Sequence, residues 1–419
     1  MAGIQGILEA VLQLADTNVT NAEKIKHAAH AIKDKIIRTR RHLHERPEIS
    51  WRESGTTDYI EKRLRELGLV NITRGFGGTS SGVTADLEGA EGGLCVALRA
   101  DIDALPITEE NDADYRSKND GAMHACGHDG HMSALLGAAE ILSEARHEIQ
   151  GRVRFIFQPA EEIGDPSGAC EMVKEGVLDG VDAIGGMHLW SFVRAGLVQW
   201  RIGPVMASSD RLNVSFTGKG GHGAMPHTAI DPIVASAAYI SAIQTITSRE
   251  INPTDAAVVT IGRINAGETF NVIPGKAELL GSLRSFTPDV RDKMEERLRR
   301  IAGGIASAYR CEAETSVKYM IPCVSNDARL TETLKEAAAE IVGYDNVEES
   351  PPLMISEDFS RYQEKIPGTF FFLGAGNEAI GASHPHHSPK FDIDESVLPY
   401  GAALLAAFAV KAIERLGKS

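Results

Sequence analysis

The sequence is short of positive charge. Its 43 lysines and arginines stand against 58 aspartates and glutamates, which gives a formal net charge of −15 over 419 residues. Binding to nucleic acid or to anionic membranes needs basic patches that neutralise phosphate groups. The composition therefore argues against both partners, and a small anionic substrate would need a local cation inside its own site.

Long apolar runs and cysteines are scarce too. We find no run of about 18 apolar residues, so no membrane span is expected. The first ten residues lack the basic start and the apolar core of a signal peptide. The cysteines are odd in number and scattered, which indicates reduced thiols and a cytoplasmic protein. They are Cys95, Cys126, Cys170, Cys311 and Cys323.

The length exceeds what one ordinary hydrophobic core accommodates, so two or more domains are expected. Up to about residue 205, helical and strand-like patterns alternate, which predicts an α/β layer structure. The helical patterns cover residues 22–44, 54–68 and 132–145, and the strand-like runs cover residues 82–87, 95–105, 153–157 and 183–188.

The character of the sequence changes near residue 206. From there to residue 321, the order strand, helix, strand, strand, helix, strand is the split pattern of a ferredoxin-like module. Its elements are expected at residues 210–217, 232–248, 256–265, 277–286, 288–309 and 313–320. Beyond it we expect a helix at 327–342, buried strands at 353–355 and 369–373, and an amphipathic helix at 395–416. The predicted fold is a discontinuous α/β domain (1–205 and 322–419) with a small α+β domain (206–321) inserted.

Candidate metal ligands are concentrated in one turn. Residues 124–131 place three histidines, a cysteine and an aspartate within eight positions, ahead of a helical pattern. Gly127 and Gly130 allow the backbone to fold tightly around an ion. Thiolate and imidazole ligands suit zinc and related transition metals. The competing interpretation is a helix-entry turn with surface histidines.

Three further segments add to this cluster. An apolar strand is followed by two adjacent carboxylates, Glu161 and Glu162, of which one can bind a metal while the other handles a proton. His188 ends another apolar run, and residues 384–387 hold three histidines beside prolines. Taken singly, the two glutamates could be solvated and His188 could be structural. Together, one cysteine, one glutamate and three histidines suit two metals that share a bridging ligand, with one glutamate left as a base.

Several motifs resemble those of one family, in the same order along the chain. They are residues 99–106 (RADIDALP), 126–131 (CGHDGH), 158–162 (QPAEE), 186–188 (GMH), 220–227 (GGHGAMPH), 270–274 (FNVIP), 281–286 (GSLRSF), 356–359 (SEDF) and 387–391 (HSPKF). The family is the metal-dependent amidohydrolases that include aminoacylases, hippurate hydrolases and auxin–amino acid conjugate hydrolases. The match runs from Arg40 to the C-terminal helix, and it is more specific for the family than for the substrate.

The resemblance implies a catalytic metallohydrolase domain with an inserted lid and dimerisation domain. It also implies two divalent metal ions per chain, zinc or manganese first, with cobalt and nickel as alternatives. Cys126 would bridge the two ions. His128 and His188 would complete one ion, and Glu162 and His387 would complete the other.

Further residues would support the chemistry. In other branches of the wider superfamily a His-x-Asp motif supplies a ligand where this chain has Asp101 and Asp103. Asp103 and Asp129 are expected to orient ligand imidazoles. Two cations would lower the pKa of a water held between them. Glu161 would accept the proton of that water during attack on the amide carbonyl, and would pass the proton to the leaving nitrogen.

The resemblance places the substrate contacts in the lid. His222 is the expected donor to the tetrahedral oxyanion. In relatives this donor can come from the partner subunit, which makes a homodimer or a higher homo-oligomer the expected state. Asn271 and Arg284 are expected to contact the substrate, because an arginine can grip a carboxylate in a bidentate way.

The expected reaction is hydrolysis of the amide bond of a small N-acyl amino acid. Two alternatives stay open. One is a metallocarboxypeptidase or dipeptidase, which would use the same metals on a peptide bond. The other is a metal-binding protein without catalysis, although Glu161 argues against it because metal binding alone needs no base.

Overall fold

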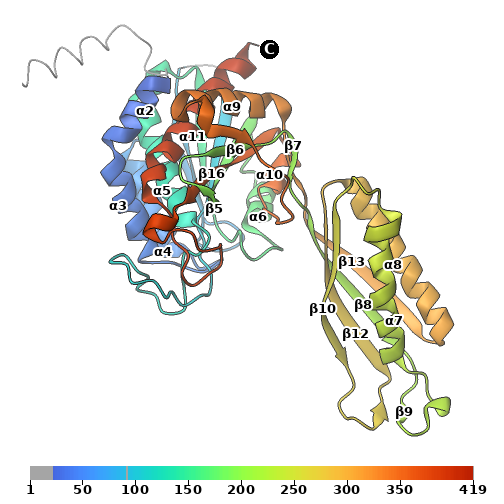
Figure 1. Cartoon of the computed structure of the whole chain (residues 1–419). Helices are drawn as coiled ribbons and strands as arrows, with labels where there is room; N and C mark the ends of the chain where they lie inside the picture. Colours follow the sequence, from blue (N-terminus) through green and yellow to red (C-terminus); the bar gives the residue numbers. More distant parts are fainter. Residues whose placement is uncertain (1–21, 91–92, 419) are drawn as a thin grey trace, which may run out of the picture. The chain divides into compact units, whose positions relative to one another are not determined.

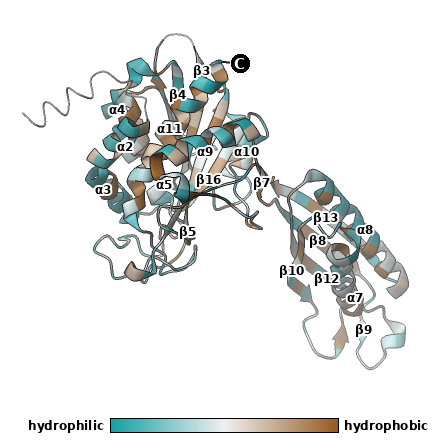
Figure 2. Ribbon diagram, turned by 45° about the horizontal axis from the view of Figure 1, so that its top comes forward, coloured by the Kyte–Doolittle hydropathy of each residue, from teal (hydrophilic) through white to brown (hydrophobic). Residues whose placement is uncertain are grey.

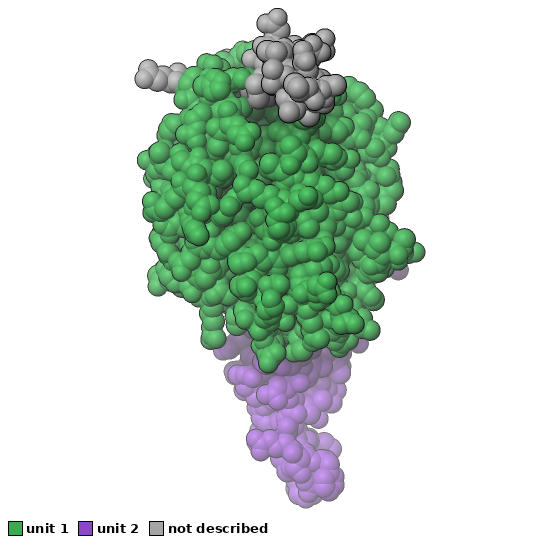
Figure 3. Space-filling model, turned by 90° about the vertical axis from the view of Figure 1, so that its left-hand side faces the viewer, with its two compact units in different colours: residues 1–202, 326–350, 361–419 green, residues 203–325, 351–360 purple. Residues whose placement is uncertain are grey.

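The structure is a computed structural model that describes residues 22–90 and 93–418 (Figure 1). The first ten residues, on which the expectation of no signal peptide rests, lie outside this part of the chain. The chain divides into two compact units, drawn in different colours in Figure 3. The first consists of residues 1–202, 326–350 and 361–419, and the second of residues 203–325 and 351–360.

One segment lies in a different unit from the one predicted. Residues 351–360 belong to the second unit, whereas the sequence pattern placed them in the α/β domain. The reason is backbone pairing, because the N–H of Leu353 donates to the carbonyl of Val205 (2.9 Å) and the N–H of Ala207 donates to Leu353 (3.0 Å). The strand predicted at 353–355 was wrong, since only an isolated bridge forms at Leu353. The two prolines at 351 and 352 have no N–H to offer to a strand ladder.

A mixed eight-stranded sheet forms the centre of the first unit, in the order β1-β2-β4-β3-β5-β16-β6-β15. The pairs β4–β3, β3–β5 and β5–β16 are parallel, and these strands are largely buried, which explains their near-continuous apolar runs. Their carboxyl ends share one edge, where ligand sites form in such sheets. The strands are β1 (Val70–Arg74), β2 (Val83–Glu88), β3 (Leu94–Asp101), β4 (Gly151–Gln158), β5 (Ala183–Arg194), β6 (Val198–Trp200), β15 (Val347–Glu349) and β16 (Gly368–Gly376).

Helices pack on this sheet. α5 and α11 contact each other and both contact β3 and β5, and Figure 2 shows hydrophobic residues concentrated there, whereas α3 is largely hydrophilic. The single helix predicted at 22–44 is interrupted at Ile32, whose ψ of 9° departs from helical geometry. The helices are α2 (Ala22–Ala31), α3 (Lys33–His44), α4 (Ser54–Glu66), α5 (His128–Glu144), α6 (Gly168–Lys174), α9 (Ala328–Val342), α10 (Ser360–Gln363) and α11 (Leu398–Gly417), with 3-10 turns at Arg146–Glu148, Tyr344–Asn346, Glu378–Ile380 and Glu395–Val397.

One helical segment of the described chain, Glu395–Gly417, is long and apolar enough to cross a membrane by length and composition. Its most apolar stretch is 83% buried inside the protein, and core helices pass the same test. Leu405, Phe408 and Ile413 of this segment lie in the hydrophobic core of the first unit. Packing against the sheet therefore accounts for its composition.

The second unit is an antiparallel α+β fold. Its sheet runs β10-β12-β8-β13, the spatial order second, third, first, fourth of a ferredoxin-like module, and α7 and α8 pack on it. The predicted fold class is confirmed. The main elements are β8 (Ser209–Thr217), α7 (Pro232–Thr245), β10 (Ala257–Ala266), β12 (Lys276–Ser285), α8 (Pro288–Tyr309) and β13 (Glu312–Ile321). The smaller ones are β7 (Gly203–Met206) paired with β14 (Val324–Asn326), β9 (Gly221–His222) paired with β11 (Val272–Ile273), a 3-10 turn at Pro226–Thr228 and a π-helical turn at Ile246–Glu250.

The limits of α8 follow from local sequence. The side chain of Thr287 accepts a hydrogen bond from the N–H of Val290, and Pro288 takes the first helical position, where its missing N–H costs nothing. At the other end Arg310 adopts a left-handed conformation (φ 62°) and closes the helix. These signals explain why the predicted range 288–309 agrees with the helix observed.

Candidate metal centre and active site

The turn that carries Cys126 is held at the start of α5. Gly127 has a φ of 89°, which L side chains rarely adopt, and it lets the chain reverse between Cys126 and the first helical residue, His128. The turn is packed tightly on β5, because a Cβ added to Gly130 would lie 2.3 Å from the side chain of Leu189. Cys126 and His128 thereby face the carboxyl edge of the parallel strands.

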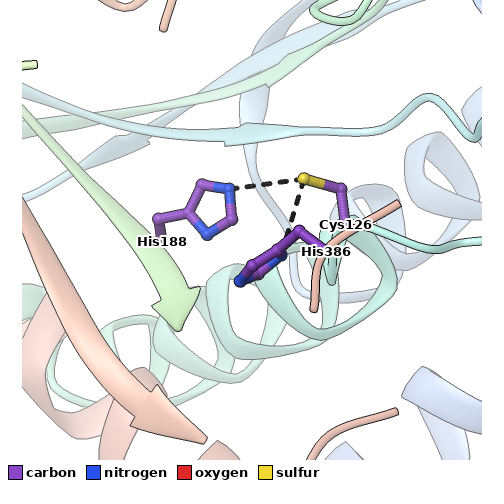
Figure 4. A group of neighbouring side chains, drawn as sticks. All are labelled: Cys126, His188 and His386. Carbon is purple, nitrogen blue, oxygen red and sulfur yellow. Dashed lines mark hydrogen bonds between the residues drawn. The ribbon is translucent and has the colours of Figure 1, made fainter. Parts of the chain in front are cut away.

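Cys126 belongs to two groups of potential ligands. One group is Cys126 with His188 and His386, and the other is Cys126 with His128 and Glu162; within each group the donor atoms lie within 4.8 Å of one another. Figure 4 shows the first group, in which Sγ of Cys126 is 3.6 Å from Nε2 of His188 and 3.8 Å from Nδ1 of His386. A sulfur shared by two groups is the arrangement that a bridging ligand requires.

Glu162 lies between two of the predicted histidines. Its Oε1 is 3.1 Å from Nε2 of His387 and 3.9 Å from Nε2 of His128. His387 has a φ of 65°, and its N–H donates to the carbonyl of Ala125 (2.8 Å), which ties the histidine-rich loop to the Cys126 turn. The structure therefore brings all five predicted ligands together from four segments of the first unit.

His386 is not among the five ligands predicted from the sequence, yet it lies in the first ligand group. Its Nε2 accepts a hydrogen bond from the N–H of Ser191 (3.3 Å), and its ring stacks on Trp190 with centroids 4.5 Å apart. These contacts aim Nδ1 at Cys126. The density of histidines in residues 384–387 is the only sequence signal that could have singled it out.

Asp103, predicted to orient a ligand imidazole, contacts His128. Nδ1 of His128 lies 2.8 Å from the Asp103 carbonyl and 3.3 Å from the Asp103 carboxylate, so Nδ1 carries the proton and Nε2 is left as the donor to a metal. That Nε2 is buried without a hydrogen-bond partner. Asp129 does not contact a ligand imidazole, because its Oδ2 accepts from Nε of Arg40 (2.6 Å) and lies 2.8 Å from Nδ1 of His44. It thus anchors α3 to the start of α5.

His131 is held by partners at both ring nitrogens. Its Nδ1 lies 2.6 Å from Oδ1 of Asp101, and its Nε2 accepts from the N–H of Leu189 (2.8 Å). Arg99 donates to the other oxygen of Asp101 (2.9 Å). This chain fixes the segment of β5 next to His188, which gives His131 a structural role.

The charges of the site fit divalent cations. Burial opposes the charged form of His128, but Asp101 and Asp103 outweigh it and raise the pKa of the imidazole to about 10. Burial raises the pKa of the Cys126 thiol, and Glu162 raises it further. The carboxylates that contribute to both shifts place negative charge in a buried site, which a divalent cation would neutralise. A thiolate, imidazoles and a carboxylate are a donor set that zinc and related ions accept.

The predicted lid residues lie in the second unit. His222 pairs with Val272 across the β9–β11 ribbon, and Asn271 accepts from the N–H of Gly223 (2.8 Å) through its carbonyl, so His222 and Asn271 share this ribbon. Arg284 lies near the end of β12 and donates to the hydroxyl of Ser356 (2.8 Å). Within this unit the structure does not bring Arg284 to the ribbon.

The chain resembles known proteins over most of its length. The profile of peptidase family M20/M25/M40 matches residues 97–411. The N-acetylcysteine deacetylase of Bacillus subtilis is 42% identical over 393 residues, which cover 93% of this chain and 100% of that protein. Thermostable carboxypeptidase 1 of Saccharolobus solfataricus is 42% identical over 392 residues, which cover 93% and 98%. A solved structure from Bacillus subtilis, described as a dinuclear metal-binding peptidase of the M20 family, matches with a TM-score of 0.82 at 39% identity, over 92% and 99%.

The fold and the paired ligand groups define a metal-dependent hydrolase with a dinuclear site. The chain belongs to peptidase family M20/M25/M40, and it is a metal-dependent amidohydrolase or peptidase of that family. The resemblance drawn from the sequence motifs is confirmed. The alternative of a metal-binding protein without catalysis is set aside.

Proposed function

We propose that the enzyme hydrolyses the amide bond of small N-acyl amino acids. The observation that carries the proposal is the Cys126 thiol shared by two ligand groups, one of which contains Glu162, the sequence neighbour of Glu161. Two divalent ions, when bound, would lower the pKa of water and polarise the amide carbonyl. We propose zinc or manganese as the native metal, with cobalt and nickel as alternatives.

Glu162 and Glu161 divide the work in this proposal. Glu162 lies against His387 and His128 and serves as a ligand. Glu161, the preceding residue of the turn after β4, acts as the general base and acid. It accepts a proton from the attacking water and delivers it to the leaving nitrogen, so that the acid and the free amine are released together.

Arg284 supports a substrate with a carboxylate. Its guanidinium is half-buried, its hydrogen bond goes to a neutral hydroxyl, and it forms no ion pair with a described carboxylate. Burial lowers the pKa of this arginine. A cation held in this way can grip an α-carboxylate. The amino acid half of an N-acyl amino acid supplies one, and so does the C-terminus of a peptide, which keeps a metallocarboxypeptidase or dipeptidase as the second candidate.

We further propose that the working form is a homodimer or a higher homo-oligomer. Lys276 and Arg284 are eight residues apart on β12, which corresponds to about 27 Å along a strand. Lys276 pairs with Thr217, the last residue of β8, so β8 ends at the Lys276 end of β12. The ribbon with His222 emerges beyond this end. One acyl amino acid is too small to touch His222 and Arg284 of the same chain. A single site would therefore take Arg284 from one subunit and His222 with Asn271 from its partner.

Exposed apolar residues of the second unit support association. Val234 on α7 is 49% exposed, Ile264 on the edge strand β10 is 54% exposed, and Phe270 beside the ribbon is fully exposed. An edge strand also presents unpaired backbone groups that a second chain can pair with.

For the compartment, we propose the cytoplasm, because all five cysteines are free thiols.

The test measures amine release from N-acetyl, N-benzoyl and indoleacetyl amino acids and from simple dipeptides. Metal-stripped enzyme is refilled separately with zinc, manganese and cobalt, and Glu161→Gln serves as the matched variant. We expect metal-dependent hydrolysis of acyl amino acids and a loss of at least about 100-fold in kcat in the variant, with its metal content unchanged. Faster release from dipeptides than from every acyl amino acid would favour the peptidase. A Glu161→Gln variant as active as wild type would remove Glu161 from the mechanism.

A further inference from the structure

The turn that presents Glu161 and Glu162 contains an unfavourable backbone conformation. Ala160 has a φ of 49° and is fully buried, although it is not glycine. A left-handed conformation is unfavourable for a non-glycine residue, because its Cβ comes too close to the following carbonyl oxygen. Because Ala160 directly precedes Glu161, whatever holds its conformation also sets the direction of the base. The surrounding contacts must hold it.

Two buried carboxylates hold this turn from one side. Oε1 of Glu53 accepts from the N–H of Ala160 (2.8 Å), and Oδ2 of Asp103 accepts from the N–H of Glu162 (3.1 Å). Glu53 is fully buried, and Asp103 receives a further hydrogen bond from the hydroxyl of Ser50 (2.7 Å). The first and third N–H groups of the three-residue turn are thus each bound to a carboxylate from a distant segment.

Two glycines pack closely against Pro159, the residue before the turn. A Cβ added to Gly168 would lie 1.6 Å from the carbonyl oxygen of Pro159, and one added to Gly82 would lie 2.7 Å from the Pro159 ring. The N–H of Gly168 donates to the carbonyl of Ala160 (3.0 Å). Backbone therefore packs directly on backbone here, and the turn has little room to relax if Glu53 releases it.

The side chain of Glu53 does not cap the helix that it precedes. Glu53 occupies the N-cap position of α4, yet its side chain makes no capping hydrogen bond. Its second oxygen, Oε2, is buried without a hydrogen-bond partner. Burying a carboxyl group costs free energy unless the group is hydrogen-bonded. The carboxyl group of Glu53 accepts from the N–H of Ala160 (2.8 Å), and Ser81 is a further polar neighbour.

We propose that Glu53 is a positioning residue of the active site, which holds Ala160 in its left-handed conformation and so aims Glu161 and Glu162. The proposal rests on the function proposed above. Glu53 contacts neither a predicted metal ligand side chain nor Glu161 by a described hydrogen bond, and it acts through the backbone of Ala160. Asp103, which also contacts His128, completes the same clamp at Glu162.

The decisive comparison is between two variants of nearly equal shape. Glu53→Met removes the acceptor, while Glu53→Gln keeps an oxygen that can accept from Ala160. We expect Glu53→Met to lower kcat about 10–100-fold with KM within about threefold, and to lower the affinity for one of the two metal ions by a similar factor. Glu53→Gln should stay within about threefold of wild type. Adding Ala160→Gly to Glu53→Met should recover part of the loss, since glycine adopts positive φ without strain.

Metal affinity, measured by competition with a chelator, needs no substrate, so this inference is decided even if no substrate is found. Folded Glu53→Met enzyme with wild-type metal affinity and kcat would overturn it. Equal losses in Glu53→Met and Glu53→Gln would overturn it too, because the acceptor would then be irrelevant. If Glu53→Met does not fold, Glu53→Asp, whose carboxylate is one methylene shorter, takes its place in the same comparison with Glu53→Gln.

Discussion

At the scale of single residues, Cys126 differs from the other cysteines in the side chains that surround its sulfur. It has His188 and His386 within 4 Å of its sulfur, and Glu162 and His128 in its second ligand group. Cys323, by contrast, contacts a backbone carbonyl, and burial raises its pKa to about 12. Both are buried or partly buried thiols, so burial alone does not distinguish a ligand.

The shared position of Cys126 predicts an asymmetry in metal content. Cys126→Ala removes a donor from both ligand groups and should leave less than one ion per chain after gel filtration. His188→Ala removes a donor from one group and should leave about one ion per chain. Elemental analysis of the folded variants measures this, with Cys323→Ala as the control expected to keep two. Retention of one ion in Cys126→Ala would show that the sulfur serves a single metal.

The Glu53 carboxyl predicts a dependence of stability on pH. Burial, and then Asp103, raise its pKa from 4.5 to about 7. Because the folded pKa is the higher one, its contribution to stability is complete below about pH 4.5 and is lost as the pH rises through 7. Glu53→Gln has no proton to lose there. Its stability relative to wild type should therefore increase between pH 4.5 and pH 8.5, by on the order of 3 kcal/mol.

Urea unfolding of both proteins at the two pH values, in the presence of excess chelator, measures this difference. The difference in unfolding free energy between the two proteins removes the contribution of every group that titrates alike in both. A constant difference between the two proteins at both pH values would contradict the shifted pKa of Glu53.

At the scale of elements, two helical glycines differ in the space around them, so replacing each with alanine should have opposite effects on stability. Gly304 lies on the exposed side of α8 with nothing within 4 Å of an added Cβ, so Gly304→Ala should stabilise the protein by about 0.5–1 kcal/mol. Gly168 begins α6 against the carbonyl of Pro159, and Gly168→Ala should destabilise by at least about 2 kcal/mol and also lower kcat. Thermal unfolding and steady-state kinetics measure both. Equal effects of the two substitutions would contradict the close packing at Pro159.

Elements whose ends are marked locally were predictable, and elements that depend on partners were not. The cap and the proline at the start of α8 are neighbours in sequence, so the range 288–309 could be read directly. The run 353–355 looked like a buried strand, but Ile355 is 41% exposed and no strand forms. Whether such a run pairs depends on the backbone it meets, and this information is not in the run itself.

At the scale of the whole molecule, the distance between Arg284 and the His222 ribbon predicts complementation between subunits. We co-express His222→Ala and Arg284→Ala chains with different affinity tags and isolate the mixed population. Each homodimer should be inactive, whereas each mixed dimer should hold one intact site. Because every isolated dimer then holds one intact site of two, activity should recover to about half of wild type. No recovery would mean that both residues serve a site within one chain, or that they serve no site.

The five candidate ligands that the structure brings together, the ferredoxin-like order of the inserted unit and the family could be predicted from the sequence alone. The reason is that they depend on residue type, short spacing and period, which are local properties. Only the tertiary structure decided that Asp129 binds Arg40 and His44, that His386 faces Cys126, and that Glu53 reaches Ala160 across 107 positions of sequence. These contacts join segments that the chain itself keeps far apart. They form because the parallel strands bring their carboxyl ends to one edge and the helices pack the remaining segments against it.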